Sequence, residues 1–294
     1  MFTNRVAIVT GASRGIGSAL SLELIRQGAR VVACGKTLYS DPKNAYPGSL
    51  QELASRVRQE HPTLTGENFP MLSHRCDLLD YTQIRDMINY TIKKWGRIDY
   101  VINNAGALKM KPSTEYSLKD FNLVHGINVR GTFFTSTLAI PHLLESPIET
   151  PKIINLSPPL PLDPEWYPIG GSAYTLSKHA MSSLVQAWNQ EYPGLRCYSV
   201  WPETLINTAA VQSLLGKREA RKSSRTPEFV AKSIMIALED DFTKKDKVHW
   251  TDQELFLTRY SESELEGYQY LDTPPLPDIF HGNPKNFPTL ATKN

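Results

Sequence analysis

The sequence predicts an α/β protein with a Rossmann-type fold, a doubly wound parallel β-sheet flanked by helices on both faces. Three observations support this fold class. Short apolar runs alternate with longer amphipathic stretches along most of the 294 residues, as expected for strand–helix–strand units. The first apolar run leads directly into the glycine-rich turn TGASRGIG and then into a helical pattern. Further along, YTLSK places a tyrosine and a lysine four residues apart in another helical pattern.

Strands are expected where β-branched and other apolar residues cluster between turn signals. The expected strands are residues 5–10, 30–34, 71–76, 99–103, 152–157, 195–201 and 247–250. Because helical patterns separate them, the strands should run parallel. Ligands of such sheets bind beyond the carboxyl ends of the strands.

Helices are expected where apolar residues recur every three or four positions. These are residues 15–27, 49–60, 82–95, 117–144 and 173–191, with two shorter helices between Thr204 and Leu238. Residues 36–48 and the proline-rich residues 158–168 interrupt the pattern. We expect a single domain of residues 1–267, followed by a proline-rich tail of residues 268–294 that forms an irregular strap or frays.

Composition indicates a soluble protein with one large core. The chain is 40% apolar and 21% charged, and its net charge of +2 gives no reason to expect a nucleic-acid partner. No membrane span, signal peptide or peroxisomal C-terminal tripeptide is evident, so a cytoplasmic location is expected. Cys34, Cys76 and Cys197 are odd in number and widely spaced. They are expected to be reduced, buried thiols, with neither a disulfide framework nor a metal site.

The glycine turn has the pattern of a dinucleotide-binding site. Gly11, Gly15 and Gly17 lie between a buried strand and the start of a helix. Unpaired backbone N–H groups and the positive end of the helix dipole would face a pyrophosphate there. Alternatively, the glycines only make the turn.

Tyr174 and Lys178 are candidates for acid–base chemistry. Their spacing of four residues places both side chains on one face of a helix. A cation near the phenol favours the phenolate, and would bring a tyrosine pKa of about 10 closer to neutrality. Taken alone, the same spacing also occurs on solvated helix faces.

Six motifs in order give the chain a resemblance to the short-chain dehydrogenase/reductase family, from about Arg5 to Trp250. They are TGASRGIG, CDL at 76–78, NNAG at 103–106, INV at 127–129, Ser157 at the end of a strand, and YTLSK. NLSPPLPLDPEWY, AYTLSK and WPETLINTAA further resemble the reductase domain of the hydroxysteroid-dehydrogenase-like proteins. Some of those proteins add a sterol-carrier domain, for which this chain is expected to be too short.

The resemblance implies a catalytic set of Asn128, Ser157, Tyr174 and Lys178. Tyr174 would exchange a proton with the substrate oxygen while a hydride moves between nicotinamide and the carbinol or carbonyl carbon. Ser157 would hold that oxygen. Lys178 would lower the pKa of Tyr174 and bind the nicotinamide ribose, and Asn128 would hold a proton-relaying water. On local sequence alone, Ser157 can instead cap a turn, and Asn128 can bond to neighbouring backbone.

The resemblance also implies a cofactor site that spans the ends of several strands. It consists of Gly11, Ser13, Arg14, Gly15, Ile16, Gly17, Lys36, Asp77, Asn104, Ala105, Gly106, Tyr174, Lys178, Pro202, Ile206 and Thr208. Asp77 is expected at the adenine, although it can equally cap the following helix. Ile206 and Thr208 are expected at the nicotinamide carboxamide and the adjacent phosphate. The family usually has Pro-Gly where this chain has Pro202–Glu203, which leaves the local backbone open.

Charge at the end of the second strand favours NADP(H) over NAD(H). An NAD enzyme has an acid there to accept from the ribose hydroxyls, whereas a 2′-phosphate needs cations. The chain reads VVACGKT, with Lys36 and no acid, and Arg14 lies in the glycine turn. Asp41 is the nearest acid along the chain that could reverse this preference, and either cation could instead be a solvated surface charge.

The expected activity is therefore NADP(H)-dependent reduction of a carbonyl group of a lipophilic small molecule, or oxidation of the alcohol. Leu160, Trp166 and Tyr167 are the tentative substrate contacts, although aromatic residues of a loop also pack into cores. An NAD-dependent alcohol dehydrogenase and a non-catalytic dinucleotide-binding sensor or scaffold are the alternatives. Helix 173–191 has more apolar positions than one core-facing stripe requires, which favours a homodimer or homotetramer.

Overall fold

The computed structural model describes residues 2–41, 47–240, 247–270 and 274–283, and a seven-stranded sheet lies at its centre. The strand order is β3-β2-β1-β4-β5-β6-β7, and all neighbouring strands are parallel. The strands are β1 (Val6–Thr10), β2 (Arg30–Gly35), β3 (Met71–Arg75), β4 (Tyr100–Asn103), β5 (Lys152–Leu156), β6 (Arg196–Trp201) and β7 (His249–Thr251). This confirms the predicted doubly wound Rossmann-type fold.

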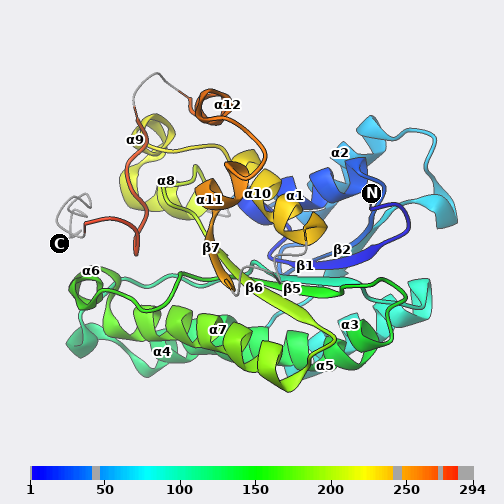
Figure 1. Cartoon of the computed structure of the whole chain (residues 1–294), viewed down its shortest axis with the longest axis horizontal. Coiled ribbons are helices and arrows are strands. Elements are labelled where there is room, and N and C mark those ends of the chain that lie inside the picture. Colours follow the sequence, from blue (N-terminus) through cyan, green and yellow to red (C-terminus); the bar gives the residue numbers. More distant parts are fainter. Residues whose placement is uncertain (1, 42–46, 241–246, 271–273, 284–294) are drawn as a thin grey trace.

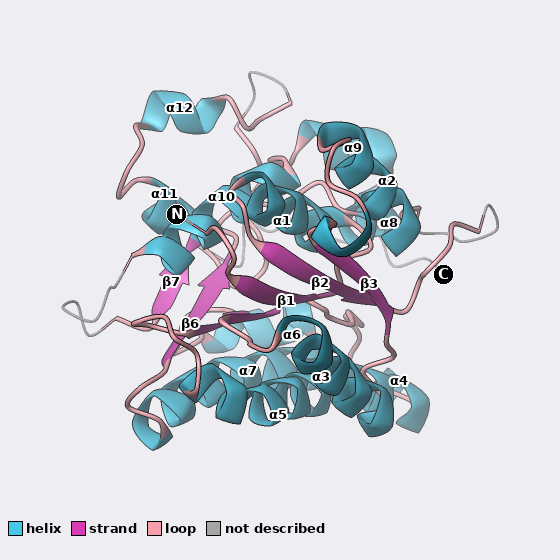
Figure 2. Cartoon of the chain, turned by 90° about the vertical axis from the view of Figure 1, so that its right-hand side faces the viewer, coloured by secondary structure: helices cyan, strands magenta, loops and turns pink. Residues whose placement is uncertain are grey.

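Helices cover both faces of the sheet, as Figures 1 and 2 show. One layer contains α3 (Tyr81–Trp95), α4 (Leu118–His125), α5 (Thr132–Leu144) and α7 (Ser172–Glu191). The opposite layer contains α1 (Gly15–Arg26), α2 (Leu50–Glu60) and α10 (Pro227–Glu239). Local capping residues determine where some of these helices begin or end. Ser49 and Glu52 form a capping box at the start of α2, and Gly96 ends α3 in a left-handed conformation with φ of 73°.

The alternation of side chains along each strand divides the apolar core into two layers. In β1, Ala7 and Val9 pack with residues of α1 and α10. Ile8, which points the other way, packs with residues of α3, α5 and α7. Because successive side chains of a strand point to opposite faces, a fully apolar strand requires a helix layer on each side.

The structure differs from the prediction in several helices. Residues 117–144 are not one regular helix, because a π-helical segment, Gly126–Gly131, lies between α4 and α5. Three helices rather than two follow β6, since Gly216, with φ of 82°, separates α8 (Ala209–Leu215) from α9 (Lys217–Lys222). The prediction also missed α6 (Tyr167–Gly170), α11 (Asp252–Phe256) and α12 (Glu262–Glu266). Helices of four or five residues are too short to show a period.

Parts of two predicted segments lie outside the described residues. These are residues 42–46 of the interruption at 36–48, and residues 271–273 and 284–294 of the tail. The division into a domain of residues 1–267 and a tail remains a prediction. Cys34, Cys76 and Cys197 are all buried and free. Among the described helices, none combines the length and the apolar character of a membrane-spanning segment.

Candidate active site

The glycine turn after β1 packs directly against the turn after β4. Gly11 has φ of 67°, and a Cβ atom on it would lie 2.9 Å from both the Asn104 amide nitrogen and the Ala105 Cα. A Cβ on Gly17 would lie 2.4 Å from the same Asn104 nitrogen and 2.6 Å from the Gly11 carbonyl oxygen. Only glycine fits at these two positions, and the close approach leaves the first turn of α1 open toward a ligand.

Thr10 joins the ends of β1 and β4, a role that the motif did not reveal. Its hydroxyl accepts from the backbone N–H groups of Asn104 and Ala105, at 3.1 Å each, and donates to the Ile102 carbonyl. The Asn104 side chain returns a bond of 2.8 Å to the Thr10 carbonyl. The one sequence feature that could have indicated this role is that Thr10 is a polar residue at the end of an otherwise apolar strand.

A cavity of about 290 Å³ lies at the N-terminus of α1. It is lined by Arg14, Gly15, Ser18, Ala19, Pro47, Arg56, Asn207, Thr208, Ala209, Gln212, Pro227, Glu228 and Tyr270. Thr208 approaches Gly15 so closely that a Cβ there would lie 3.3 Å from its methyl group. The glycine contacts and the open helix N-terminus fit the pyrophosphate of a dinucleotide. Ser13, Gly106, Pro202 and Ile206 lie at the ends of the same strands, and Ile16 packs on the core below α1.

Two cations lie at the carboxyl end of β2, each with a polar neighbour. The Lys36 ammonium pairs with Asp77 at 2.8 Å, and the Arg14 guanidinium donates to the Thr37 hydroxyl at 2.9 Å. Burial alone would raise the pKa of Asp77, but Lys36 and the Leu79 N–H hold it below its usual value. The acid that pairs with Lys36 is thus Asp77, from the end of β3, and not Asp41. Thr37 is a further hydroxyl at this position that the sequence prediction did not include.

Helix α7 carries Tyr174 and Lys178 on its buried face, next to the end of β5. The Lys178 ammonium donates to the Leu156 carbonyl at 2.8 Å and lies 5.3 Å from the centre of the Trp201 ring. Burial lowers the pKa of Lys178 to about 8, opposed by the negative charge of Asp278. The lysine is therefore fixed one residue from Ser157.

The Ser157 hydroxyl is fully buried and has no hydrogen-bond partner among the described residues. Its neighbours are well fixed, because the Pro158 carbonyl accepts from the Ser182 hydroxyl of α7 at 2.5 Å. A buried hydroxyl without a partner costs free energy, on the order of 1–3 kcal/mol. Such a hydroxyl group at the carboxyl end of a parallel strand is suited to bind the oxygen of a ligand.

Asn128 lies in the π-helical segment and is fully buried. Its side chain bonds to both backbone groups of Ala107, accepting from the N–H at 2.8 Å and donating to the carbonyl at 3.0 Å. It also donates to the Ser177 hydroxyl at 2.9 Å. A Cβ on Gly106 would lie 3.6 Å from the Asn128 oxygen and 3.5 Å from the Lys178 nitrogen. Asn128 and Lys178 therefore face the same short stretch of backbone after β4.

The pKa of Tyr174 differs in direction from the sequence expectation. Burial of the phenol raises its pKa above the ordinary value, and the negative charge of Asp278 and the neighbouring Tyr116 add to this. The Lys178 ammonium, which bonds to the Leu156 carbonyl, does not offset this burial. The Phe280 ring lies nearly parallel to the Tyr174 ring, with 6.0 Å between the two ring centroids. The sequence prediction missed Phe280, because it lies 106 positions after Tyr174 in the irregular tail.

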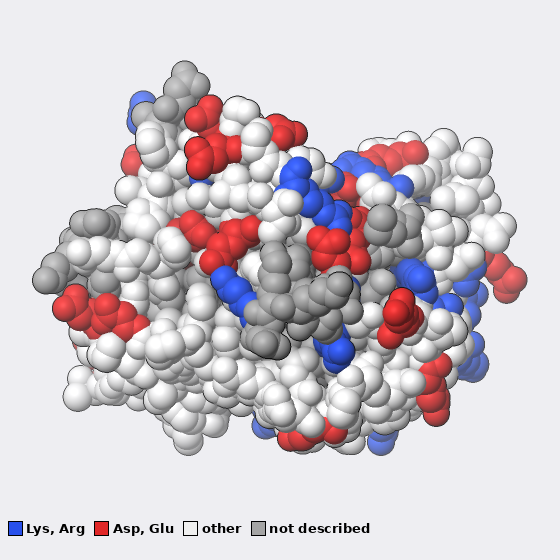
Figure 3. Space-filling view, viewed as in Figure 1, with Lys and Arg blue, Asp and Glu red and all other residues white. Residues whose placement is uncertain are grey.

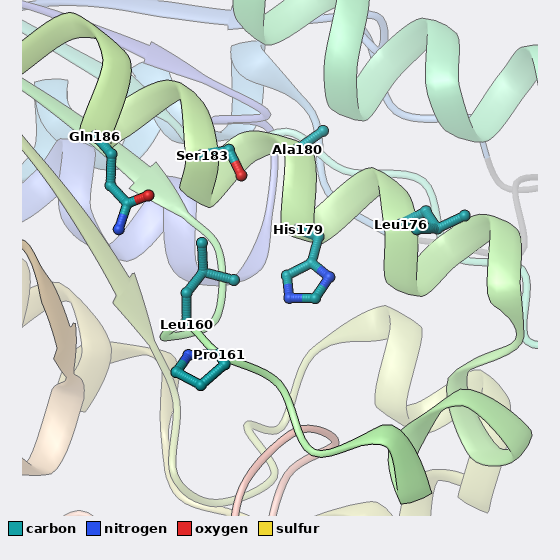
Figure 4. Close-up of a pocket in the computed structure, with 7 residues that line it drawn as sticks. All are labelled: Leu160, Pro161, Leu176, His179, Ala180, Ser183 and Gln186. Atoms are coloured by element: carbon teal, nitrogen blue, oxygen red, sulfur yellow. The ribbon is translucent and has the colours of Figure 1, made fainter.

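The three tentative substrate residues lie in different surroundings. Trp166 is buried beside Tyr174, Trp201 and Phe280, so the inward alternative for this side chain is the observed one. The Tyr167 hydroxyl lies 3.5 Å from His179 on α7. Leu160 lines a separate surface hollow of about 540 Å³ on the outer face of α7, together with Pro161, Leu176, His179, Ala180, Ser183 and Gln186 (Figure 4). The structure therefore brings Trp166, but not Leu160, next to Tyr174, one of the predicted catalytic residues.

The sequence model of the family described as short chain dehydrogenase matches residues 5–219. A hydroxysteroid dehydrogenase-like protein 2 from Danio rerio is 39% identical over 224 residues, 76% of this chain and 51% of the relative. The protein of that name from Xenopus laevis is 35% identical over 282 residues, 92% of this chain and 62% of the relative. The chain thus spans about half to three-fifths of the length of these relatives.

Solved structures share the fold over nearly the whole chain. A short chain dehydrogenase from Mycobacterium thermoresistibile is 27% identical, with a TM-score of 0.81 and 99% of each chain covered. A short chain dehydrogenase from Mycobacterium paratuberculosis, solved bound to NAD, is 25% identical with a TM-score of 0.66, covering 88% of this chain and 99% of the other. An alcohol dehydrogenase from Thermococcus sibiricus, complexed with 5-hydroxy-NADP, is 22% identical with a TM-score of 0.64, covering 84% and 94%, and shows the fold alone.

Proposed function

The chain belongs to the short chain dehydrogenase family of dinucleotide-dependent oxidoreductases, and on that premise we propose that it uses NADP(H) to reduce a carbonyl group of a lipophilic small molecule. The reverse reaction, oxidation of the corresponding alcohol, uses the same residues. The observation that carries the proposal is the buried Ser157 hydroxyl, which has no partner among the described residues and lies next to the residue that fixes Lys178. A site that had lost turnover would have no reason to keep such a costly group.

Each residue has a distinct part in the proposed reaction. The nicotinamide ring, when bound, supplies the hydride. Ser157 donates a hydrogen bond to the carbonyl oxygen, and Tyr174 gives its phenolic proton to that oxygen as negative charge develops there. The proposed part of Lys178 is to stabilise the tyrosinate through its positive charge, which requires its ammonium to turn from the Leu156 carbonyl toward the phenol. Asn128 positions the backbone at Ala107 and, as the family relation implies, the proton path to Lys178.

The preference for NADP(H) rests on the two cations at the end of β2. The Lys36 side chain is 69% exposed although it pairs with Asp77, so its ammonium can turn toward a 2′-phosphate. Arg14 and the Thr37 hydroxyl provide further donors next to it. Charge-assisted bonds to phosphate are shorter and stronger than neutral ones. The Lys36–Asp77 pair is also the observation that favours the second candidate, an NAD-dependent enzyme, because Asp77 neutralises one of the cations.

The proposed lipophilic substrate follows from the apolar surroundings of Tyr174. Its neighbours are Val124, Trp166, Trp201, Ile279 and Phe280, with Ala107, Leu108, Met110, Leu162 and Ile169 packed around them. A charged or strongly hydrated molecule would lose its water there without gaining partners. The apolar part of a lipophilic substrate would instead contact these apolar side chains and leave water, which is favourable.

The test is a survey of ketones and aldehydes with the purified chain, following the loss of reduced cofactor by absorbance. We expect turnover of apolar carbonyl compounds with a kcat/KM at least tenfold higher for NADPH than for NADH. Turnover with a preference for NADH would replace the proposal by its NAD-dependent alternative. Tight dinucleotide binding without turnover of any carbonyl or alcohol would support the non-catalytic sensor or scaffold.

A further inference from the structure

Residues 276–281, called the strap below, lie across the carboxyl end of β6. The strap pairs antiparallel with the loop after that strand. The Leu205 N–H donates to the Leu276 carbonyl at 2.9 Å, and the Asp278 N–H donates to the Glu203 carbonyl at 3.0 Å. The indole N–H of Trp201 donates to the Ile279 carbonyl at 2.8 Å, across 78 residues of sequence. The strap, in red in Figure 1, therefore becomes part of the site although it is remote in the chain.

Glu203 anchors the strap, at the position where the family usually has glycine. Its carboxylate accepts from the Thr251 hydroxyl and lies 3.5 Å from the His281 ring nitrogen, with which it pairs when the histidine is protonated. Its own N–H donates to Asp252 at 2.9 Å. A glycine at position 203 would have only the backbone bonds. The glutamate that replaces the usual glycine of the family therefore makes side-chain contacts that hold the strap.

Phe280 is the residue by which the strap reaches the catalytic centre. Its ring is stacked on Tyr174, with 17° between the planes, and also contacts the rings of Trp166 at 6.1 Å and Trp201 at 5.7 Å. In the part of the chain that the structure describes, Phe280 thereby fills a slot bounded by three aromatic rings. A flat apolar group of about this size is what such a slot accommodates.

The strap closes the route to the catalytic hydroxyl groups. With Phe280 in place, Tyr174 is only 5% exposed and Ser157 is fully buried. A carbonyl oxygen has to reach the hydroxyls of both residues, and its carbon has to carry the rest of the substrate. The Phe280 ring occupies the space beside Tyr174 that such a body would need. For the proposed reaction, we therefore expect the strap to move before a substrate binds.

Features of the closed strap also oppose closure. Phe280 has φ of 71°, a left-handed conformation that bulky side chains rarely adopt. Burial raises the pKa of Asp278 to about 8, and the nearby Asp252 adds to this, opposed by the Ile279 N–H and by Lys178. Backbone bonds and aromatic contacts hold the strap shut, whereas backbone strain at Phe280 and the partial burial of the Asp278 carboxyl group weaken it. Such a balance allows a ligand to displace the segment.

We propose that the strap is a cover which the substrate displaces, and that Phe280 holds the place of an apolar ring of the substrate. This inference rests on the proposed oxidoreductase function and narrows its substrate class to carbonyl compounds with a flat apolar ring next to the reacting carbon. Phe280 is then the residue that determines specificity, because any substrate has to make better contacts with Trp166, Tyr174 and Trp201 than Phe280 does.

A disulfide that locks the strap tests the proposal. Thr204 and Pro277 face each other as an antiparallel bridge pair between the two flanking hydrogen bonds. The Cα atoms of such a pair are about 4.5 Å apart, within the range that a disulfide spans. The Thr204 hydroxyl has no partner among the described residues and proline has no N–H, so Thr204→Cys with Pro277→Cys removes no hydrogen bond of either residue.

The oxidised and reduced forms of this double variant are compared with NADPH and two probes, acetophenone and the straight-chain 2-octanone. Locking should lower kcat/KM for acetophenone at least twentyfold, with an unchanged Kd for NADPH, and a thiol reductant should restore it. Wild type treated with the same oxidant is the control, since its own three cysteines are buried. Equal kcat/KM for the locked and reduced forms would overturn the cover.

The role of Phe280 is tested in the locked protein. Phe280→Ala should restore acetophenone turnover at least fivefold and raise 2-octanone turnover less, because the empty slot fits the ring better. Leu276→Ala, also on the strap, is the matched control and should restore neither. No gain from Phe280→Ala would overturn the assignment of Phe280 as the place-holder.

A readout without turnover separates the failure of this inference from that of the proposed function. If wild type reduces no carbonyl with either cofactor, the oxidoreductase proposal fails, and amide hydrogen exchange then decides about the cover. The N–H groups of Leu205 and Asp278 should exchange at least a hundredfold faster than those of β6, and locking should slow them. Exchange as slow as that of β6 would show that the strap does not open.

Discussion

We expect the choice of cofactor to depend on two single residues, Lys36 and Arg14. Removing both with Lys36→Ala and Arg14→Ala should raise the Kd for NADPH at least tenfold and leave the Kd for NADH within about threefold. The reason is that a charge-assisted bond to a phosphate contributes on the order of 1.5–3 kcal/mol, and NADH lacks that phosphate. Fluorescence titration measures both constants.

Matched controls separate the lysine from its partner. Lys36→Ala in an Asp77→Asn background removes the cation without leaving an unpaired carboxylate. Lys94→Ala removes a lysine on α3 whose contact with Glu67 is a loose 4.0 Å, and should change neither Kd. Equal losses for NADPH and NADH would show that the pair does not read the 2′-phosphate.

Asp252 gives the stability of the protein a pH dependence. Its carboxyl group is fully buried at the start of α11, and burial raises its pKa to about 7. One oxygen accepts from the N–H groups of Glu203 and Gln253, at 2.9 and 2.8 Å, and the other has no partner among the described residues. The folded state therefore binds a proton that the unfolded chain releases near pH 4. This contribution is present below pH 4 and is lost as the pH rises through about 7.

Asp252→Asn removes this titration and keeps the accepting oxygen. The variant should lose less stability than wild type between pH 5 and pH 8, by on the order of 1–3 kcal/mol. Denaturant unfolding at both pH values measures the difference. Asp278 titrates in the same direction, so a smaller slope should remain in the variant. A slope identical to that of wild type would mean that Asp252 is already ionised in the folded protein at pH 5.

At the scale of the elements, Gly17 in α1 shows how a helix is adapted to its neighbour. Alanine usually stabilises a helix interior by up to about 1 kcal/mol relative to glycine. At Gly17 its methyl group would meet Asn104 at 2.4 Å and the Gly11 carbonyl at 2.6 Å. Gly17→Ala should therefore lower Tm and weaken NADPH binding at least tenfold, because the turn after β4 has to shift away from α1.

Gly194 supplies the control for this substitution. A Cβ there would lie 3.4 Å from a Leu144 methyl group, an ordinary contact. Gly194→Ala should leave the Kd for NADPH unchanged. If Gly17→Ala bound NADPH as wild type does, the close packing of the two turns would not matter for the cofactor.

Helices and strands that are determined by nearby residues could be predicted from the sequence, whereas features that depend on distant residues could not. Caps such as Ser49 and Gly96 and the apolar strands are visible in the sequence, so those ends were predicted to within one or two residues. The π-helical segment at Asn128 was not, because one wide turn barely disturbs a helical period. The raised pKa of Tyr174 also escaped prediction, since it depends on burial under Phe280 and on Asp278, both from the distant tail.

At the scale of the whole molecule, we expect the outer face of α7 to pack against a second copy of the chain. Helix α7 contains one lysine, Lys178, which is buried, and one acid, Glu191, together with His179. Figure 3 shows few charged side chains on the surface over α7. Leu176 is 49% exposed at the edge of the hollow that Leu160 and Ala180 also line. An apolar face of this kind is typical of a symmetric interface, so we expect a dimer or tetramer.

Leu176→Asp tests that expectation, because it places a charge on the face without touching the core. Light scattering should report a dimer or larger for wild type at micromolar concentration and a smaller species for the variant. Leu257→Asp, at a residue 38% exposed after α11, is the control and should not change the mass. A monomeric wild type would refute the proposed assembly.

The proposed activity is hydride transfer with Tyr174 as the acid and base. Tyr174→Phe keeps the ring that packs on Phe280 and removes only the transferable proton. The decisive measurement is the rate of NADPH oxidation by wild type and by this variant, on whichever carbonyl compound wild type reduces best, with the Kd for NADPH determined for both. The variant should have a kcat at least a thousandfold lower than wild type and a Kd for NADPH within about threefold of it. More than a tenth of the wild-type turnover with unchanged binding would contradict the role of Tyr174.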